Sequence, residues 1–598
     1  MAVFQLDFTM IRKVVMATTS GISGTQPGQR QLNGPQTTGR GYRNLSEPQF
    51  HTRHDLNVGV EVRDGTVLLA DVHRPDADGR FPALVAASPY PRQIQDLGAP
   101  AGFIEAGATD FWVPRGYVHV IANVRGTGGS GGDFGFFDSA ERRDMHDLVE
   151  WAAAQPWCDG NVGMIGISYF AMTQLEAAVE RPPHLKAIFP VAVTSDLYEA
   201  AAHHGLSSAA FVTPFLSMLG LTAERSDHVW RSPLINGLRH LLTTPRVHHK
   251  FATMNGEAAV TMMHALLKLS HDPHPWDELW FDVMVKHPAR DDWWEERNLI
   301  PMLENVDIPV YLGCDWENAP LHLPSTFTTW LSLSNSPAVR MGMLGEFGLT
   351  WPWESLHVEA LAWYDHWLKG HDTGILDGPA VRYYLPGADD WRTAETWPPP
   401  GKHLEWALRA DGTLAQDEGN PGAVEFMVLG AGLGRARTSP IDPPSSLSWT
   451  SAPLDATIDV VGDIELRLVA SATAADTAWI VTLQDVAPDD VVDDVTAGWL
   501  RASMREIDEA ASRPGAPVLP CRTPVAVPIG EAIVYRIPLV PNARRFNASH
   551  RIRLVLTSDD QDPDTPAIMN FRHASVGTSS VNTVRSSSRL LLPVLTTG

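Results

Sequence analysis

One short stretch of this sequence constrains the fold more than any other. An apolar run ends at Gly166-Ile167-Ser168, and a segment able to form a helix follows without a break. A serine on a tight turn between a strand and a helix is typical of a nucleophile elbow, which needs small neighbours because the two elements pass close together. Gly166 meets this need before the serine, whereas Phe170 occupies the usual glycine position after it and Ala171 is the nearest small residue. The Gly-Ile-Ser triplet alone also fits a turn whose serine has no catalytic role. Whether Ser168 is a nucleophile therefore depends on the other motifs of the sequence.

Strand-like and helix-like segments alternate on both sides of this stretch. The expected strands are 58–62, 66–72, 81–87, 117–124, 187–193, 308–313 and 339–344, and the expected helices are 139–151 and 357–368. Strands that alternate with helices in this way predict an α/β fold with a mostly parallel, doubly wound sheet.

The pattern along the chain predicts four parts. Residues 1–50 lack an apolar period and are expected to be a poorly ordered extension. The α/β core is expected over 51–195 and 300–375, interrupted by a helical cap at 196–299 that is rich in His and Trp. Short alternating strands with Pro, Gly and Asp turns fill residues 376–598. They predict an all-β domain, a sandwich or jelly roll.

The composition narrows the possible partners. With 46 basic and 70 acidic residues the net charge is −24, which argues against a nucleic acid or an anionic membrane surface. Three cysteines are too few for a disulfide framework, so a reducing, cytoplasmic location is expected. Neither a signal peptide nor a membrane span is predicted. The charge itself does not identify a substrate. A small molecule is expected as the partner, and the chain is compatible with a homo-oligomer.

Two further patterns favour structural interpretations. The glycine-rich stretch 126–131 matches a dinucleotide-binding pattern, but Gly132-Asp133-Phe134-Gly135 follows it where a phosphate site needs a helix N-terminus. The histidines of the expected cap show neither a His-x-x-x-His spacing nor a supporting acid. No cofactor and no metal site are therefore expected.

Several motifs, in one order along the chain, resemble a known family. They are Arg63-Asp64-Gly65, Leu69-Ala70-Asp71-Val72, Ser88-Pro89-Tyr90, Arg125-Gly126, Gln155-Pro156-Trp157, the 161–169 elbow, Trp363-Tyr364-Asp365-His366-Trp367-Leu368 and Trp499-Leu500-Arg501-Ala502-Ser503. From about residue 55 to the end, the chain resembles the family of cocaine esterase and X-Pro dipeptidyl-peptidase, which includes the α-amino-acid ester hydrolases. The resemblance implies an α/β-hydrolase core, a helical cap and a C-terminal jelly roll.

The resemblance also implies roles for individual residues. Ser168 would be the nucleophile, and the Tyr169 backbone N–H and the Tyr90 hydroxyl would bind the oxyanion. The acid of the family closes a turn after a later strand, and alignment on the aromatic residue there places Glu317 in its position, with Asp315 as the alternative.

The histidine of the family motif is absent from its expected place. Leu349 occupies that position, in the loop before the Trp363 helix. A serine needs an imidazole nearby to become a good nucleophile at neutral pH. His357 is the nearest substitute and the expected general base. His322, which shares the loop of the acid, and His366, on the amphipathic helix, are the alternatives.

These observations predict a serine hydrolase that cleaves an ester or an amide by acyl transfer to water. The alternative is a diverged relative that lacks the usual histidine and binds a ligand or performs a non-hydrolytic step, such as a cyclisation or isomerisation. A jelly-roll carbohydrate-binding module fused to an inert core is a third interpretation. Asp196 and Glu199 are candidates for a carboxylate cluster that would bind a substrate ammonium group.

Overall fold

The computed structural model describes most of the chain. It covers residues 38–98, 104–223, 233–244, 246–247, 256–345, 352–430, 444–561 and 565–595. Most of the predicted extension, including residues 1–37, and Leu349 lie outside the described residues.

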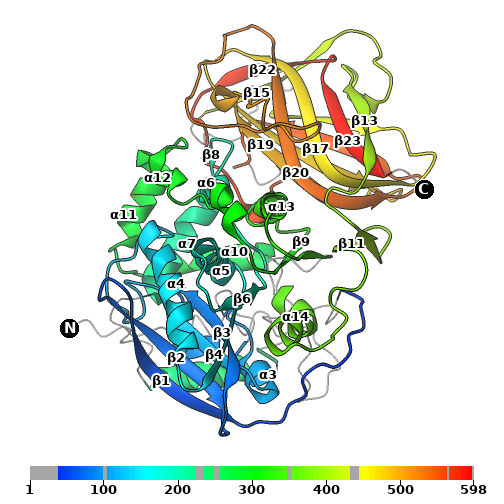
Figure 1. Cartoon of the computed structure of the whole chain (residues 1–598). Coiled ribbons are helices and arrows are strands. Elements are labelled where there is room, and N and C mark those ends of the chain that lie inside the picture. Colours follow the sequence, from blue (N-terminus) through cyan, green and yellow to red (C-terminus); the bar gives the residue numbers. More distant parts are fainter. Residues whose placement is uncertain are drawn as a thin grey trace.

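A ten-stranded sheet forms the core of the first part of the chain (Figure 1). Its strand order is β1-β2-β4-β3-β5-β6-β9-β10-β11-β12, and each neighbouring pair from β4 to β11 is parallel. The strands are β1 Thr52–Glu61, β2 Val67–Pro75, β3 Phe81–Ser88, β4 Val118–Asn123, β5 Cys158–Met164, β6 Leu185–Ile188, β9 Val310–Asp315, β10 Val339–Leu344, β11 Val381–Leu385 and β12 Asp390–Ala394. The predicted doubly wound α/β sheet is confirmed.

One predicted strand is shorter than expected. The apolar run 187–193 continues past β6, but beyond Ile188 the ladder is reduced to isolated bridges from Val191 to Ile167 and Gly313. Pro190 lies between these parts, and its ring nitrogen has no hydrogen to donate to a neighbouring strand. The run therefore ends as an irregular segment that crosses the carboxyl edge of the sheet next to the elbow.

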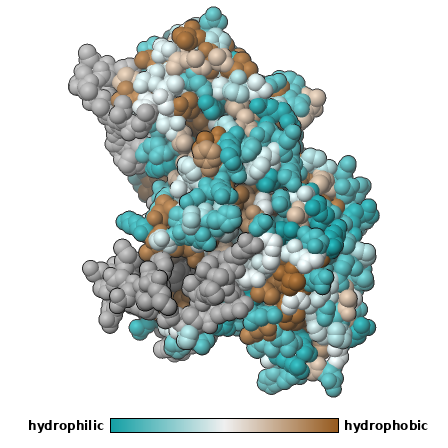
Figure 2. All heavy atoms as spheres, turned by 90° about the vertical axis from the view of Figure 1, so that its left-hand side faces the viewer, coloured by the Kyte–Doolittle hydropathy of each residue, from teal (hydrophilic) through white to brown (hydrophobic). Residues whose placement is uncertain are grey.

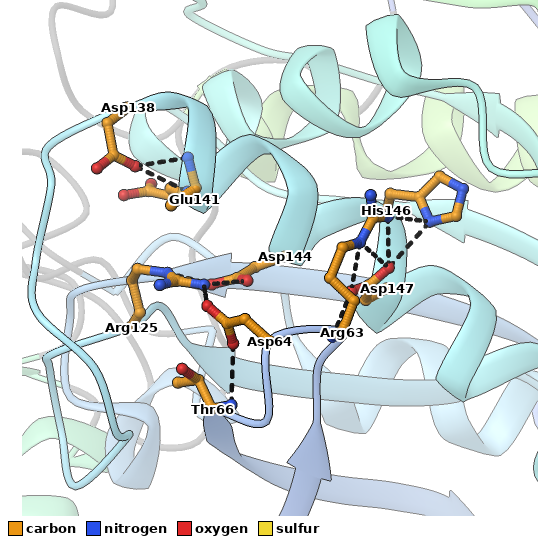
Figure 3. Close-up of polar contacts among 10 residues, drawn as sticks. Arg63, Asp64, Thr66, Arg125, Asp138, Glu141, Asp144, His146 and Asp147 are labelled. Carbon is orange, nitrogen blue, oxygen red and sulfur yellow. Dashed lines mark hydrogen bonds and ion pairs between the residues drawn. The ribbon is translucent and has the colours of Figure 1, made fainter.

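Helices cover both faces of the sheet. They are α2 Arg92–Gln95, α3 Thr109–Trp112, α4 Ser139–Ala153, α5 Tyr169–Glu180, α13 Leu323–Ser332 and α14 Pro352–Lys369, with short turns at η1 Val113–Arg115 and η3 Ile300–Asn305. Helix α4 begins as predicted, because the Asp138 carboxylate accepts hydrogen bonds from the N–H groups of Ala140 and Glu141 (Figure 3).

An ionic cluster ties the β1–β2 turn to α4 (Figure 3). Arg125 lies between two carboxylates, with Nη2 3.1 Å from Asp64 Oδ2 and Nε 2.6 Å from Asp144 Oδ2. Arg63 pairs with Asp147 at 2.6 Å one turn further along the helix. The Arg-Asp-Gly and Arg-Gly motifs thus hold the hairpin against the core and do not contact the elbow serine.

A mainly helical segment separates β6 from β9. It contains α6 Leu197–Ala201, β7 Ala202–His203, β8 Leu206–Ser207, α7 Ala209–Thr222, α8 Leu234–Thr243, α10 Gly256–Leu266, α11 Trp276–Phe281, η2 Asp282–Lys286 and α12 Asp292–Glu295. These elements lie beside the carboxyl edge of the sheet in Figure 1.

The last third of the chain is an all-β domain, as predicted. Its eleven strands form one sheet that closes on itself, because β23 pairs with both β13 and β17. The strands are β13 Gly401–Leu408, β14 Thr413–Ala415, β15 Ala423–Val428, β16 Ser446–Ser451, β17 Ile458–Ala472, β18 Ala478–Val486, β19 Val492–Arg501, β20 Ile533–Phe546, β21 Arg551–Thr557, β22 Ser580–Arg585 and β23 Arg589–Leu595, with short turns at η4 Ala502–Met504 and η5 Ile568–Asn570.

The β domain lies against the cap elements and α13 (Figure 1). Phe571 stacks on Phe211 of α7 with ring centroids 4.7 Å apart, and the Ala574 N–H donates to the Ser207 carbonyl at 2.9 Å. Figure 2 shows one outer face, on which hydrophilic residues predominate and hydrophobic residues form small patches between them. Among the residues that the structure describes, no helix combines the length and the apolar composition that crossing a membrane requires.

Candidate active site

Ser168 occupies a strained turn between β5 and α5. Its φ of 57° and ψ of −117° are unusual for a residue other than glycine. Gly166 must be small, because a Cβ there would lie 2.3 Å from Phe170 Cβ and its φ of +128° suits glycine alone. Phe170 takes the place of the usual second glycine and is fully buried, with its ring 6.0 Å from that of Tyr90. The predicted elbow geometry is therefore present despite this departure.

The imidazole beside Ser168 belongs to His322. Its Nε2 lies 3.1 Å from Ser168 Oγ. His322 follows β9 and immediately precedes α13, and its backbone N–H donates to the Asn318 carbonyl at 3.2 Å. The side chain is almost completely buried. The loop after β9 and the elbow after β5 thus bring an imidazole and a serine hydroxyl together at the carboxyl edge of the sheet, as an activated serine would require.

A hydroxyl group orients this imidazole. Thr194 Oγ1 lies 2.7 Å from His322 Nδ1 and 3.5 Å from the Leu321 carbonyl oxygen. The threonine can accept the Nδ1 hydrogen while its own hydrogen points to the carbonyl. His322 Nε2 is then unprotonated and can accept the hydrogen of the Ser168 hydroxyl.

Burial controls the charge of the base. It lowers the pKa of His322 to about 3, and no carboxylate of the described residues contacts either ring nitrogen. A carboxylate partner would favour the imidazolium, but a neutral threonine does so much less. His322 is therefore a neutral imidazole throughout the physiological pH range.

Two donors lie where an oxyanion would form. Tyr90 follows β3, is buried, and forms a hydrogen bond with the Ser168 side chain. Burial, with a smaller contribution from Glu105, raises the pKa of Tyr90 well above its ordinary value, so its hydroxyl keeps its hydrogen. The Tyr169 N–H opens helix α5 and has no acceptor among the described residues. The two groups can donate to one oxygen atom bound above Ser168.

A small apolar cavity of about 60 Å³ lies against the serine. Its walls come from the elbow, the cap and the β9 loop, and no carboxylate is among the described lining residues. The lining residues are Tyr90, Phe136, Phe137, Ser168, Tyr169, Met172, Thr194, Leu197, Ala200, Ala201, Phe211, Val212, Phe215, Leu216, Val283, Leu321 and His322.

The structure does not bring the expected base to the serine. His357 lies on α14, where its ring packs against Phe111 with centroids 4.6 Å apart. The expectation that His357 replaces the missing motif histidine is therefore corrected in favour of His322, the alternative from the loop of the acid. Proximity in sequence to the family position favoured His357, but the fold brings the β9 loop to the elbow.

Neither predicted acid contacts the imidazole. Asp315, at the end of β9, is fully buried and its Oδ1 accepts the Asn318 N–H at 2.9 Å. Burial, followed by the nearby Glu317, raises the pKa of Asp315 well above its ordinary value, so its side chain is neutral. Glu317 is partly buried beside it. The place of the acid on His322 Nδ1 is taken by Thr194, which a search for carboxylates overlooks.

The carboxylates of Asp196 and Glu199 are also engaged elsewhere. Arg290 Nη2 lies 2.5 Å from Asp196 Oδ2 and 3.2 Å from Glu199 Oε1, and neither acid lines the cavity. Both carboxylates thus contact Arg290 outside the cavity, and the structure does not place them where a substrate ammonium group would lie beside Ser168.

A mostly parallel sheet with a serine on the tight turn after a central strand and a histidine beside it is typical of the α/β-hydrolase class. Residues 64–346 match the X-Pro dipeptidyl-peptidase (S15 family) domain, and residues 373–567 match the X-Pro dipeptidyl-peptidase C-terminal non-catalytic domain. The two matches span well over half of the chain, which belongs to this hydrolase family, as the sequence motifs predicted.

Individual relatives agree along nearly the whole length. The chain is 26% identical to the cocaine esterase of Rhodococcus sp. (strain MB1 Bresler), a match that covers 90% of this chain and 98% of the relative. A CocE/NonD family hydrolase structure from Staphylococcus aureus is similar with a TM-score of 0.70 at 20% identity, covering 91% of this chain and 94% of the other. An α-amino acid ester hydrolase structure has a TM-score of 0.67 at 18% identity, covering 94% and 99%.

Proposed function

We propose that this protein is a serine esterase for substrates with a small, apolar acyl group. The observation that carries the proposal is the 3.1 Å contact between Ser168 Oγ and His322 Nε2 at the wall of an apolar cavity. Membership of a hydrolase family that includes a named esterase supports it.

The reaction follows from the positions of these groups. His322 Nε2 takes the hydrogen as Ser168 Oγ attacks the ester carbonyl carbon, and the negative charge on the carbonyl oxygen is bound by Tyr90 and the Tyr169 N–H. His322 then returns the hydrogen to the leaving alcohol, which leaves the acyl group on Ser168. In the second half of the cycle a water molecule gives a hydrogen to His322 Nε2 as its oxygen bonds to the acyl carbon. The bond between that carbon and Ser168 Oγ then breaks, His322 gives the hydrogen to Ser168 Oγ, and the acid is released.

Esters suit this site better than amides. Each proton transfer to His322 creates an imidazolium, which Thr194 stabilises less than a carboxylate would. An amide needs more assistance because its carbonyl is less reactive and its amine must be protonated to leave. The apolar lining also offers no carboxylate to bind the N-terminal ammonium of a peptide among the described residues.

The test combines labelling with turnover. A fluorophosphonate probe should label the wild-type protein at Ser168, and p-nitrophenyl acetate or butyrate should be hydrolysed faster than the palmitate ester. Ser168→Ala should abolish both labelling and hydrolysis. A folded wild-type protein that is not labelled, or hydrolysis that survives in Ser168→Ala, would contradict the proposal.

A further inference from the structure

A buried chain of side chains links the C-terminal β domain to the loop that carries His322. Asp560 and His573 belong to the β domain and His203 to β7. Asp560 Oδ2 lies 2.8 Å from His573 Nδ1, and His573 Nε2 lies 2.6 Å from His203 Nδ1. His203 Nε2 lies 2.5 Å from the Pro320 carbonyl oxygen. Each of the three side chains is at most 3% exposed.

The Pro320 end of this series of hydrogen-bonded residues lies next to the candidate active site. Pro320 is two residues before His322, and Leu321 between them lines the cavity. Trp499 of β19 stacks on His203 with centroids 4.4 Å apart, and the backbone N–H of His573 donates to Asp560 Oδ1 at 2.9 Å. The rings of His203 and His573 are therefore held in place, and the hydrogen bond from His203 restrains the position of the Pro320 carbonyl.

The direction of each hydrogen bond follows from the acceptor at the Pro320 end. A carbonyl oxygen can only accept, so His203 Nε2 donates to Pro320. Burial lowers the pKa of His203 well below its ordinary value, so its ring is neutral and its Nδ1 carries no hydrogen. His203 Nδ1 therefore accepts, and His573 Nε2 donates to it. The Asp560 side chain holds the other ring nitrogen of His573 at 2.8 Å.

Other charged groups surround the chain. From the cap side, His204 lies beside His203 and is 3.6 Å from Glu199. From the β domain, Asp559 lies beside Asp560, and Arg572 donates to the Asp560 carbonyl. Asp560 is the carboxylate in direct contact with a ring nitrogen of His573.

We propose that Asp560 and His573 are positioning residues for the reaction at Ser168, acting through His203 on the Pro320 carbonyl and hence on the loop that holds His322. The inference rests on the proposed esterase function. It assigns a part in the reaction to a domain whose matched description is non-catalytic. His573 lies just beyond the range of that match.

The test is His573→Phe in the full-length protein. Phenylalanine keeps an aromatic ring beside Trp499 but can neither donate to His203 Nδ1 nor form a hydrogen bond with the Asp560 side chain. His203 then loses the partner that fixes its ring, and its hydrogen bond to Pro320 is no longer held in place. The value of kcat for p-nitrophenyl acetate should fall about tenfold, with KM changed less than twofold.

His550→Phe is the matched control. His550 belongs to the same domain and pairs with the buried Asp485 at 2.8 Å, but this pair does not reach the β9 loop. The kcat of this variant should follow the wild type. A folded His573→Phe variant with unchanged kcat would overturn the inference. The absence of Ser168-dependent hydrolysis in the wild type would instead refute the proposed function.

Wild-type protein provides a second measurement that needs no stable His573 variant. In a protein labelled with 15N-histidine, the ring of His203, assigned with His203→Gln, should be neutral at pH 7 with its hydrogen on Nε2. A hydrogen on Nδ1 of that ring would overturn the inference.

Discussion

One contact distinguishes the two histidines considered as the general base. His322 Nε2 lies 3.1 Å from Ser168 Oγ, whereas the His357 ring packs against Phe111. Sequence order alone had favoured His357, because it follows the position of Leu349 most closely. The loop after β9, in which the acid was expected, therefore places the imidazole of His322 next to the serine.

Replacing each histidine separates the two candidates. His322→Ala should lower kcat for p-nitrophenyl acetate about a thousandfold, because the serine then has no base. His357→Ala should stay within about twofold of the wild type. Steady-state kinetics on both variants, with fluorophosphonate labelling of Ser168, measures the difference. Full activity in His322→Ala would exclude it as the base.

The buried base predicts an unusual pH profile. Because burial lowers the pKa of His322 to about 3, the neutral and active form persists well below the ordinary histidine pKa of about 6.5. The value of kcat/KM should therefore change less than twofold between about pH 5 and pH 7, where an ordinary histidine base would lose most of its activity. A fall centred near pH 6.5 would contradict the neutral, carboxylate-free environment. The profile should be measured with an ester whose leaving group does not titrate in this range.

At the scale of elements, the sequence predicts the positions of strands and helices better than the contacts between loops. Apolar runs and an Asp cap indicated β10 and the start of α4 correctly, because burial and capping are local properties. Gly166 and Ser168 marked the elbow for the same reason. Thr194 could not be found in this way. It ends an irregular segment after Pro190, and its contact with His322 depends on two loops that are far apart in sequence.

The elbow predicts a sharp difference between two glycines. Gly166→Ala places a Cβ 2.3 Å from Phe170 Cβ at a φ of +128°, so several kcal/mol of stability should be lost. Gly237 lies inside α8 with nothing within 4 Å of its Cβ position, and Gly237→Ala should raise stability by about 0.5–1 kcal/mol. Urea unfolding of both variants measures the contrast. A Gly166→Ala protein as stable as the wild type would contradict the close approach of strand and helix.

At the scale of the whole molecule, the cap and the β domain are joined by polar contacts in addition to apolar packing. Arg290 pairs with Asp196 and Glu199, and its backbone N–H donates to the Cys521 carbonyl of the β domain at 2.9 Å. The guanidinium also lies over the Tyr198 ring, 4.9 Å from its centroid. One arginine therefore holds the start of the cap and a loop of the β domain in a single cluster.

Removing this side chain should destabilise the start of the cap, whereas the backbone contact with Cys521 is kept. Arg290→Met keeps much of the apolar contact but leaves two carboxylates in a mostly buried place without their cation, which costs about 3 kcal/mol. Arg43, which pairs with Asp372 and Asp377 on the surface and is 52% exposed, is the matched control. Arg43→Met should lower stability much less, because water and salt screen an exposed ion pair. Urea unfolding, followed by tryptophan fluorescence, should show the larger shift only for Arg290→Met. Because an unpaired carboxylate is relieved by a proton, that deficit should be smaller at pH 5 than at pH 8, and a deficit independent of pH would show that lost packing and not lost charge destabilises the variant.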